Sequence, residues 1–282
     1  MKIAVTGASG FIGRHVLAEL SQHDVELVAV TRDPVRLRNL SDSARVVKMD
    51  IARPTSDSFE LLGKPDILIN LAWDGLPNYK SLHHFETELP KHYQFLKAMV
   101  ESGLPSLLVT GTCFEYGMQS GALSATMQTK PSNPYGYAKD ALRQQLEYLK
   151  QTKPFNLTWG RLFYIYGEGQ TGTSLYPKLK EAVMRGEKVF NMSGGEQLRD
   201  FLHVKEVAHK IVNLALEGCN FGAINICSGN PISVRRLVEQ LLSENGWEID
   251  LNLGYYPYPD YEPMAFWGTE PVVPTQVAQI KL

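Results

Sequence analysis

Short apolar runs alternate with amphipathic stretches through the first half of the chain. Between the runs, residues 11–22 and 88–103 have apolar positions at helical spacing. Continuous apolar runs predict strands that are buried on both faces of a sheet. Strand–helix alternation predicts right-handed crossovers, and hence an α/β fold with a Rossmann-type, doubly wound parallel sheet. The runs, rich in Val, Ile, Leu and Ala, are residues 2–7, 25–31, 44–51, 65–72 and 106–112.

The pattern loosens after about Arg161, where glycines and aromatic residues increase. Residues 253–271 are rich in Tyr, Pro and Trp and show no clear period. We therefore expect residues 1–165 to form the Rossmann domain and residues 166–282 to form mostly a smaller C-terminal α/β substrate lobe. Apolar positions at helical spacing predict that residues of about 200–218 return to pack on the first domain.

Glycines recur at three-residue intervals directly after the first predicted strand. Gly7, Gly10 and Gly13 stand where that strand gives way to the first predicted helix. Glycine permits a tight turn, and the missing side chains let the backbone approach a pyrophosphate. The free N–H groups of a helix N-terminus favour an anionic ligand. The sequence thus predicts a dinucleotide-binding loop with a variant glycine spacing, and a purely structural turn is the alternative.

The end of the second predicted strand bears on the choice of cofactor. About 20 residues after such a loop, a carboxylate that accepts from the ribose 2′-OH favours NAD, whereas an arginine accommodates the 2′-phosphate of NADP. That region is Thr31-Arg32-Asp33. We predict NADP(H), with Arg32 pairing with the 2′-phosphate and stacking on the adenine. NAD(H) is the alternative, with Arg32 in solvent and Asp33 in the carboxylate role.

Two tyrosines precede a lysine in the stretch NPYGYAKDALRQQLEYLK. Pro134, after residues that can cap a helix, predicts a helix that runs to about Lys150. On a helix, Tyr135 and Lys139 share a face, whereas Tyr137 lies about 200° around the axis from Tyr135. An ammonium stabilises a phenolate, so the first pair can act as a proton shuttle. An exposed helical pair is the alternative.

A hydroxyl that could hold a carbonyl oxygen follows the fifth predicted strand. Ligands of open α/β sheets bind at the carboxyl edge of the strands, where the stretch VTGTCFEYG is expected to lie. Thr110 and Thr112 both supply a hydroxyl there, and the pattern does not choose between them.

Composition and charge exclude several kinds of partner. The chain has 282 residues, of which 44% are hydrophobic, and its net charge is −2. It carries no basic stripe, so we expect no nucleic-acid partner. No apolar run approaches the ~18 residues that span a bilayer, and the N-terminus lacks a signal-peptide pattern, so we expect no membrane partner.

Cysteine and histidine usage gives no metal-site pattern. Cys113, Cys219 and Cys227 are odd in number and scattered, which favours free thiols in a reducing cytoplasm. His83 and His84 are adjacent, but no other histidine or cysteine lies at zinc-site spacing. We therefore expect no metal and a cytoplasmic location.

Together, these motifs resemble the extended short-chain dehydrogenase/reductases that act on nucleotide sugars, the sugar-nucleotide epimerase/dehydratase family. The resemblance covers nearly the whole chain. It implies that residues 1–165 bind NADP(H) and that residues 166–282 mostly bind the sugar nucleotide. The motifs that carry it are TGASGFIG, NLAW, VTGTCFEYG, YGYAK, RLFYIYG, GGEQLRDFLHVKEVA and NICSGNPISVRRL.

The resemblance also implies roles for single residues. The catalytic set is Thr112, Tyr135 and Lys139, with Lys139 also binding the nicotinamide ribose. The expected substrate contacts are Thr112, Tyr164 and Arg199, and the guanidinium fork of Arg199 suits a diphosphate. With the residues chosen above, the expected cofactor contacts are Gly7, Gly10, Phe11, Ile12, Gly13, Arg32, Asp50, Ile51, Leu71, Ala72, Tyr135 and Lys139.

Departures from the family's pattern reduce the number of activities that the resemblance allows. Sugar-nucleotide dehydratases of the family place an Asp-Glu pair directly after the catalytic threonine, where this chain has Cys113 and Phe114. We therefore reject dehydratase activity, and we expect Glu115 to point to the other side if the segment stays extended. Tyr164 replaces an Asn that commonly contacts substrate. Residues 255–268, which contain no Arg or Lys, replace an arginine-containing segment, and their aromatic rings either stack on the ligand or pack the small lobe.

The predicted function is reduction of a nucleotide-linked 4-keto-6-deoxyhexose, a dTDP- or CDP-sugar, in deoxysugar biosynthesis such as that of lipopolysaccharide O-antigen. A reductase must exchange its cofactor and usually takes NADPH, which agrees with the interpretation of Arg32. An NAD-dependent 4-epimerase is the first alternative, and an NADP-binding redox sensor without turnover is the second. The family also implies a homodimer, in which Leu142, Leu146 and Leu149 either form the interface or pack on the chain's own sheet.

Overall fold

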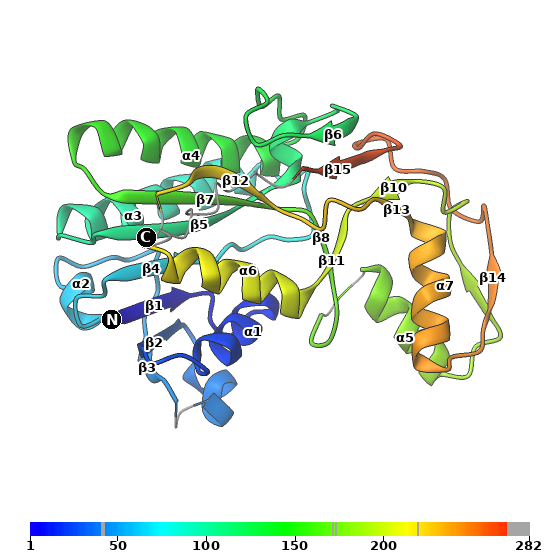
Figure 1. The fold of residues 1–282 in the computed structure, drawn as a ribbon, viewed down its shortest axis with the longest axis horizontal. Coiled ribbons are helices and arrows are strands. Elements are labelled where there is room, and N and C mark those ends of the chain that lie inside the picture. Colours follow the sequence, from blue (N-terminus) through cyan, green and yellow to red (C-terminus); the bar gives the residue numbers. More distant parts are fainter. Residues whose placement is uncertain (41–42, 171, 173, 219, 270–282) are drawn as a thin grey trace, which may run out of the picture.

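The computed structural model describes residues 1–40, 43–170, 172, 174–218 and 220–269, which form a larger and a smaller lobe (Figure 1). Seven parallel strands form the sheet of the larger lobe, in the order β12-β7-β5-β4-β1-β2-β3. The predicted α/β fold with a doubly wound parallel sheet is thereby confirmed. The strands are β1 (Lys2–Thr6), β2 (Glu26–Thr31), β3 (Arg45–Lys48), β4 (Ile67–Asn70), β5 (Ser106–Thr112), β7 (Asn156–Leu162) and β12 (Gly222–Ile226).

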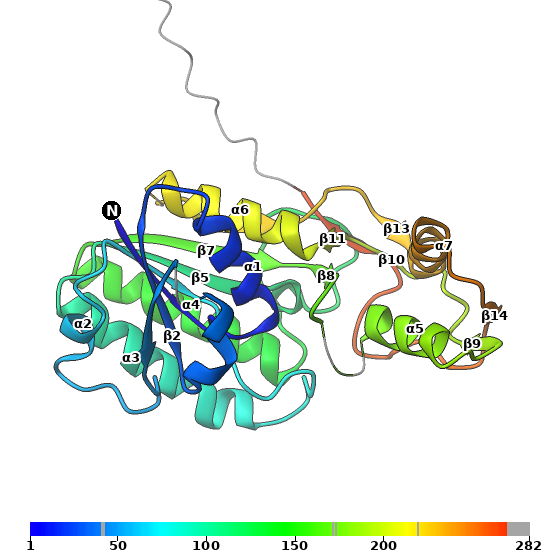
Figure 2. The same ribbon diagram turned by 90° about the horizontal axis from the view of Figure 1, so that it is seen from below.

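Helices cover both faces of this sheet (Figures 1 and 2). Successive side chains of a strand point to opposite faces, and β1 shows this directly. Ile3 and Val5 join the apolar cluster under α1 and α6, whereas Ala4 joins the cluster under α3 and α4. The helices of this lobe are α1 (Phe11–Leu20), α2 (Ser58–Leu61), α3 (Leu89–Glu101), α4 (Pro134–Thr152) and α6 (Val204–Leu216), with 3-10 helices at Pro34–Leu40 and Cys113–Tyr116 and a π-helical turn at His84–Glu88.

Helix α6 lies against α1, although α1 ends at Leu20 and α6 begins only at Val204 (Figure 2). Val207, Ile211 and Val212 are fully buried in this contact. The smaller lobe has its own apolar cluster, which includes Leu179, Phe190 and Leu237. It comprises α5 (Leu175–Met184), α7 (Val234–Asn245), β9 (Val189–Asn191), β14 (Asp250–Asn252), β10 (Leu198–Arg199) and β13 (Ile232–Ser233).

Two short strand pairs join the lobes along the crevice between them. They are β8 (Tyr164–Tyr166) with β11 (Phe201–His203), and β6 (Gly121–Leu123) with β15 (Phe266–Gly268).

The division of the chain into domains of residues 1–165 and 166–282 stays a prediction. Residues 270–282 of the second range lie outside the described residues.

The leucines of α4 face inward. Leu142 and Leu146 are fully buried, and Leu149 nearly so, in the cluster that also holds Phe95 and Trp159. Of the two roles expected for these leucines, they therefore have the second, packing on the chain's own sheet. The outer face of α4 instead exposes Tyr137 and Tyr148.

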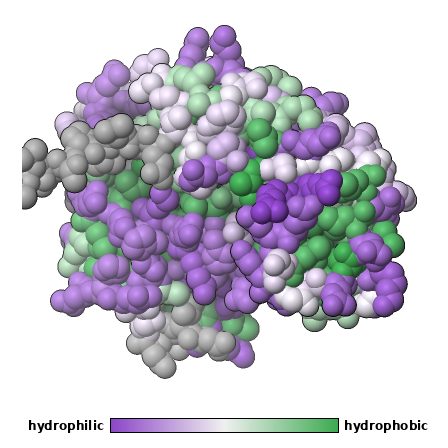
Figure 3. Space-filling model, turned by 45° about the vertical axis from the view of Figure 1, so that its right-hand side comes forward, coloured by the Kyte–Doolittle hydropathy of each residue, from purple (hydrophilic) through white to green (hydrophobic). Residues whose placement is uncertain are grey.

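The face shown in Figure 3 is mostly polar, and apolar residues gather at its right-hand side. Among the helices of the described residues, none is long and apolar enough to span a bilayer.

Candidate active site

A cradle for a dinucleotide lies at the carboxyl end of β1. Gly7 has φ of +68°, a conformation that favours glycine, and a Cβ there would stand 2.7 Å from the backbone nitrogen of Ala72. A Cβ on Gly13 would stand 2.2 Å from the carbonyl oxygen of Gly7, so this glycine lets the helix pack on the loop. In the described chain no side chain caps α1 at Gly10, and its first turn holds no carboxylate. These features fit the pyrophosphate of a dinucleotide.

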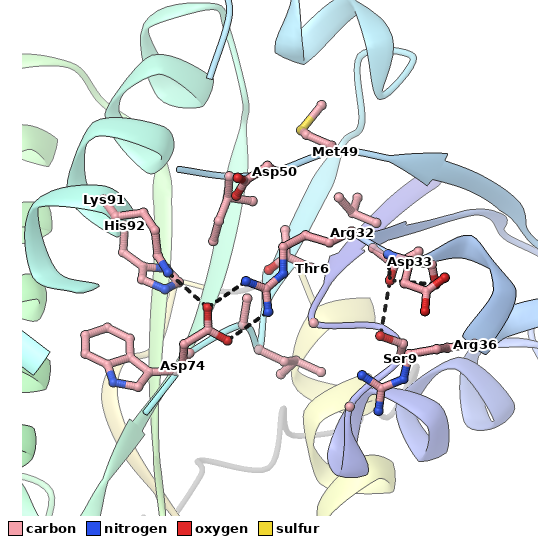
Figure 4. Close-up of a pocket in the computed structure, with 18 residues that line it drawn as sticks. Thr6, Ser9, Arg32, Asp33, Arg36, Met49, Asp50, Asp74, Lys91 and His92 are labelled. Atoms are coloured by element: carbon pink, nitrogen blue, oxygen red, sulfur yellow. Dashed lines mark hydrogen bonds and ion pairs between the residues drawn. The ribbon is translucent and has the colours of Figure 1, made fainter. Parts of the chain in front are cut away.

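A cavity of about 330 Å³ opens beside this loop (Figure 4). The predicted residues that line it are Gly7, Gly10, Arg32, Asp50, Ile51, Leu71 and Ala72. Phe11 and Ile12 line a second cavity, which faces the smaller lobe.

Arg32 extends across the first cavity to a carboxylate that the sequence did not single out (Figure 4). Its two terminal nitrogens donate to the two oxygens of Asp74, at 2.9 and 3.0 Å. Lys91 also donates to Asp74, at 3.3 Å, and contacts Glu88, which is buried. The guanidinium is thus engaged within the protein, in an exposed ion pair.

The predicted catalytic residues stand at the end of β5 and in the first two turns of α4. Thr112, Tyr135 and Lys139 are buried, whereas Tyr137 is 53% exposed. The side chain of Asn133 caps α4 by accepting from the N–H of Gly136, at 2.9 Å. This cap starts the helix one residue before Pro134, which fixes the face that carries Tyr135 and Lys139.

The hydroxyls of the two candidate threonines have different surroundings in the structure. Thr112 lines the second cavity together with Tyr135, so its hydroxyl and the phenol face the same space. Thr110 instead donates its hydroxyl to the carbonyl of Asn70, at 3.3 Å, and its own carbonyl accepts from Nζ of Lys139, at 2.9 Å.

Burial dominates the titration of the tyrosine and the lysine. It raises the pKa of Tyr135, with smaller contributions from Tyr79, Cys113 and Glu115, and the hydrogen bond from Thr112 opposes this shift. Burial lowers the pKa of Lys139 to about 7. Lys139 is therefore neutral at the pH where the phenol ionises, so its charge does not lower the pKa of Tyr135 as expected.

Two contacts fix the side chain of Lys139. Its ammonium turns toward the carbonyl of Thr110 and sits 4.0 Å from the ring centroid of Trp73, a cation–π contact. Trp73 is in turn held by His84, whose Nδ1 accepts from the indole N–H at 3.1 Å. No spacing rule points to Trp73, although it is the last residue of the NLAW motif.

Glu115 has a role that the extended-chain expectation missed. The segment after Thr112 turns into a 3-10 helix instead of staying extended, so Glu115 turns into the core and is fully buried. Its carboxylate accepts from Nε of Arg161 at 2.7 Å, from the indole of Trp159 at 3.0 Å and from the backbone N–H of Thr112 at 2.8 Å. Glu115 therefore anchors the backbone of the candidate catalytic threonine.

The second cavity, of about 770 Å³, lies between the lobes and is rich in aromatic side chains, among them Tyr79, Phe114, Tyr164 and Tyr261. Arg199 lines it but is almost fully buried, and it donates to Oε1 of Glu262 at 2.7 Å. The hydroxyl of Tyr164 donates to the other oxygen of that carboxylate.

The aromatic C-terminal segment lies partly at the second cavity and partly in the interior. Tyr261 lines the cavity, whereas Phe266 is buried 4.6 Å from the guanidinium of Arg199. The sequence did not single out Glu262, because 63 residues of chain separate it from Arg199.

Two of the three cysteines lie within the described residues. Cys113 and Cys227 are buried, and burial raises the pKa of the Cys113 thiol. Cys219 lies outside the described residues. Within the described part of the chain, no three His, Cys, Asp or Glu side chains are grouped so as to hold a metal ion.

Comparison with known proteins agrees with this geometry. The chain is 32% identical to dTDP-6-deoxy-L-talose 4-dehydrogenase (NAD(+)) of Aggregatibacter actinomycetemcomitans, over 96% of this chain and 100% of that protein. It is 28% identical to GDP-6-deoxy-D-talose 4-dehydrogenase of the same organism, over 86% of this chain and 80% of that protein.

A solved structure, MoeE5 in complex with UDP-glucuronic acid and NAD, superposes with a TM-score of 0.78. It is 26% identical in sequence, and the match covers 96% of this chain and 90% of MoeE5. Residues 3–227 match the sequence profile of the NAD dependent epimerase/dehydratase family. The predicted resemblance is thereby confirmed: the chain is an enzyme of the extended short-chain dehydrogenase/reductase type and belongs to the NAD dependent epimerase/dehydratase family.

Proposed function

We propose that the chain interconverts a secondary alcohol and a ketone at C4 of a nucleotide-linked 6-deoxyhexose, with a nicotinamide cofactor. The observation that carries the proposal is the presence of Thr112 and Tyr135 in the lining of the large interlobe cavity, with the buried Lys139 one turn along α4 from Tyr135. The two relatives named 4-dehydrogenases support the C4 position and the 6-deoxyhexose. Dehydrogenase and ketoreductase are the two directions of one reaction, and we propose the reducing direction on a dTDP- or CDP-4-keto-6-deoxyhexose in deoxysugar biosynthesis.

The residues have distinct tasks in this reaction. The cofactor, when bound, supplies or accepts the hydride. Burial keeps the phenol of Tyr135 protonated, so it can donate its proton to the C4 oxygen. Thr112, which lines the same cavity, donates its hydroxyl to this oxygen and polarises the carbonyl. Lys139, fixed by the carbonyl of Thr110, holds the nicotinamide ribose.

The dinucleotide is held by the glycine loop and by the residues that line the first cavity. Gly7 and Gly10 admit the pyrophosphate, and Gly13 allows the close packing of α1. Asp50 and Ile51 contact the adenine, and the backbone of Leu71 and Ala72 follows the cofactor. NADP(H) was the preference predicted from Arg32. The engagement of Arg32 by Asp74 and the name of the NAD(+)-dependent relative lead us to propose NAD(H) instead.

The sugar nucleotide occupies the interlobe cavity. We propose that Arg199 contacts its diphosphate and that Tyr164 lies along it, because both side chains line this cavity. Glu262, which both side chains contact, then changes partner or accepts from a ligand hydroxyl when the substrate binds.

We further propose a homodimer, through the outer face of α4. Tyr137 and Tyr148 are 53% and 67% exposed on that face, and tyrosine is favoured at protein interfaces. Sedimentation equilibrium of the chain and of Tyr148→Glu tests this. A dimer that the substitution weakens supports the interface, and a monomeric wild-type chain excludes it.

The reaction is tested by following the absorbance of NADH and NADPH with dTDP- and CDP-4-keto-6-deoxyglucose. Substrate-dependent oxidation of either cofactor is the expected result. If neither is oxidised, and the purified protein instead retains NAD and inverts C4 of a nucleotide sugar, the chain is a 4-epimerase. Binding of a dinucleotide without turnover of any nucleotide sugar would instead indicate a sensor.

A further inference from the structure

The Arg32–Asp74 ion pair joins two side chains that line the cavity beside the glycine loop (Figure 4). Arg32 directly follows β2 and Asp74 follows β4, and β1 lies between these two strands in the sheet. The pair therefore spans the carboxyl end of β1, from which the glycine loop extends. In folds of this class the residue after β2 chooses between a ribose 2′-OH and a 2′-phosphate.

Contacts with Glu88 and Lys91 hold Asp74 in position for its ion pair with Arg32. Its backbone N–H donates to Oε2 of Glu88 at 3.0 Å, and Lys91 bridges its carboxylate to Oε1 of the same glutamate. Glu88 is buried and also lies 3.2 Å from the imidazole of His83. The carboxylate of Asp74 is thus fixed by a network anchored in the protein interior, although the pair with Arg32 is itself exposed.

The charges around the cavity balance. Three cationic side chains line it, and three carboxylates line it with them: Arg32, Arg36 and Lys91, against Asp33, Asp50 and Asp74. A ribose 2′-phosphate adds about −1.5 to −2 charges near neutral pH. It would meet a surface without net positive charge, and it could use Arg32 only in competition with the bidentate contact to Asp74.

We infer that Asp74 is a specificity-determining residue, which engages Arg32 and makes the site select NAD(H) over NADP(H). The inference rests on the proposed nicotinamide chemistry and names a residue for its cofactor choice. Asp74 follows β4, whereas the residues that usually decide this choice follow β2. For this reason Thr31-Arg32-Asp33 alone predicts NADP(H).

The test is calorimetric titration of the full chain with NAD+ and with NADP+, without any sugar nucleotide. The wild type should bind NAD+ more tightly. Asp74→Asn should strengthen NADP+ binding by roughly five- to twentyfold, because a competing contact and a repulsive charge are both removed. NAD+ binding should change by about twofold or less, since NAD+ has no 2′-phosphate to meet Arg32.

Two further variants make the result specific. Asp24→Asn removes the same charge at an exposed turn just before β2, at the opposite edge of the sheet, and should leave both affinities unchanged. Adding Arg32→Ala to Asp74→Asn should cancel the gain in NADP+ affinity. A wild type that prefers NADP+, a gain below about twofold in Asp74→Asn, or a gain that survives Arg32→Ala overturns the inference. None of these outcomes depends on turnover, so a failed sugar-nucleotide assay leaves the inference standing.

Discussion

Substitution of Glu115 by Gln should destabilise the protein far more than loss of a surface ion pair. Glu115 is fully buried and Arg161 nearly so, and the carboxylate accepts from the guanidinium at 2.7 Å. Replacement by the neutral amide leaves the guanidinium buried without a countercharge. Breaking a buried pair in this way costs about 3–5 kcal/mol. The amide also lacks one of the acceptor oxygens that hold the indole of Trp159 and the backbone N–H of Thr112.

Urea unfolding, followed by circular dichroism, measures the effect in Glu115→Gln, in Arg161→Met and in the double variant. The two single substitutions should each lower the free energy of unfolding. The double variant should lower it by at least about 2 kcal/mol less than their sum, because the second change removes the unpaired charge left by the first. Helix α4 provides the matched control. Arg143 and Glu147 form an ion pair there in which the carboxylate is 44% exposed, so Glu147→Gln should cost about 1 kcal/mol or less.

The reasoning is refuted if Glu115→Gln costs no more than Glu147→Gln, or if the effects of the two buried substitutions simply add. Either result would mean that the carboxylate of Glu115 does not hold Arg161 as described.

Three other predictions concern the candidate catalytic and substrate residues. Tyr135→Phe should abolish turnover while NAD+ still binds in calorimetry, and Tyr137→Phe should leave most activity; equal losses would contradict the assignment. Lys139→Met should raise the free energy of unfolding of the cofactor-free protein near pH 7, and the gain should shrink toward pH 10.5. The reason is that burial lowers the pKa of Lys139 from 10.5 to about 7. Between these pH values the unfolded chain binds more protons than the folded chain, so the stability of the wild type rises with pH. Urea unfolding of both proteins across this pH range tests the prediction, and a gain in stability that does not depend on pH would contradict it. Arg199→Lys should raise the KM for the sugar nucleotide by roughly tenfold with little change in NAD+ affinity, because lysine lacks the bidentate fork; an unchanged KM would remove Arg199 from the substrate site.

The fold was predictable because its signals are local. Each predicted strand of the sheet is a continuous apolar run, and the glycine loop stands directly between β1 and α1. The helical spacing of Tyr135 and Lys139 likewise separates them from Tyr137 without reference to any tertiary contact. These inferences need only a period of 2 or 3.6 residues and the rigid geometry of a helix.

The remaining features depend on contacts between segments that are distant in sequence. Asp74 meets Arg32 across 42 residues, and Glu262 meets Arg199 across 63. Glu115 was misplaced because the strand ends at Thr112 and a 3-10 helix follows, which a reading of the segment as extended could not foresee. Such pairs decide which charges are available to a ligand, and the cofactor preference predicted from Arg32 took no account of Asp74.

The most direct test of the central proposal is the fate of a deuteride. The protein is incubated with NADH deuterated at nicotinamide C4 and with dTDP-4-keto-6-deoxyglucose, and the sugar product is analysed by NMR and mass spectrometry. Our account predicts one deuterium on C4 of the sugar when the transferred position carries the label, and none with Tyr135→Phe. Turnover that leaves C4 free of deuterium with both labelled faces of NADH, or deuterium at another carbon, would contradict the assignment of the reaction to C4.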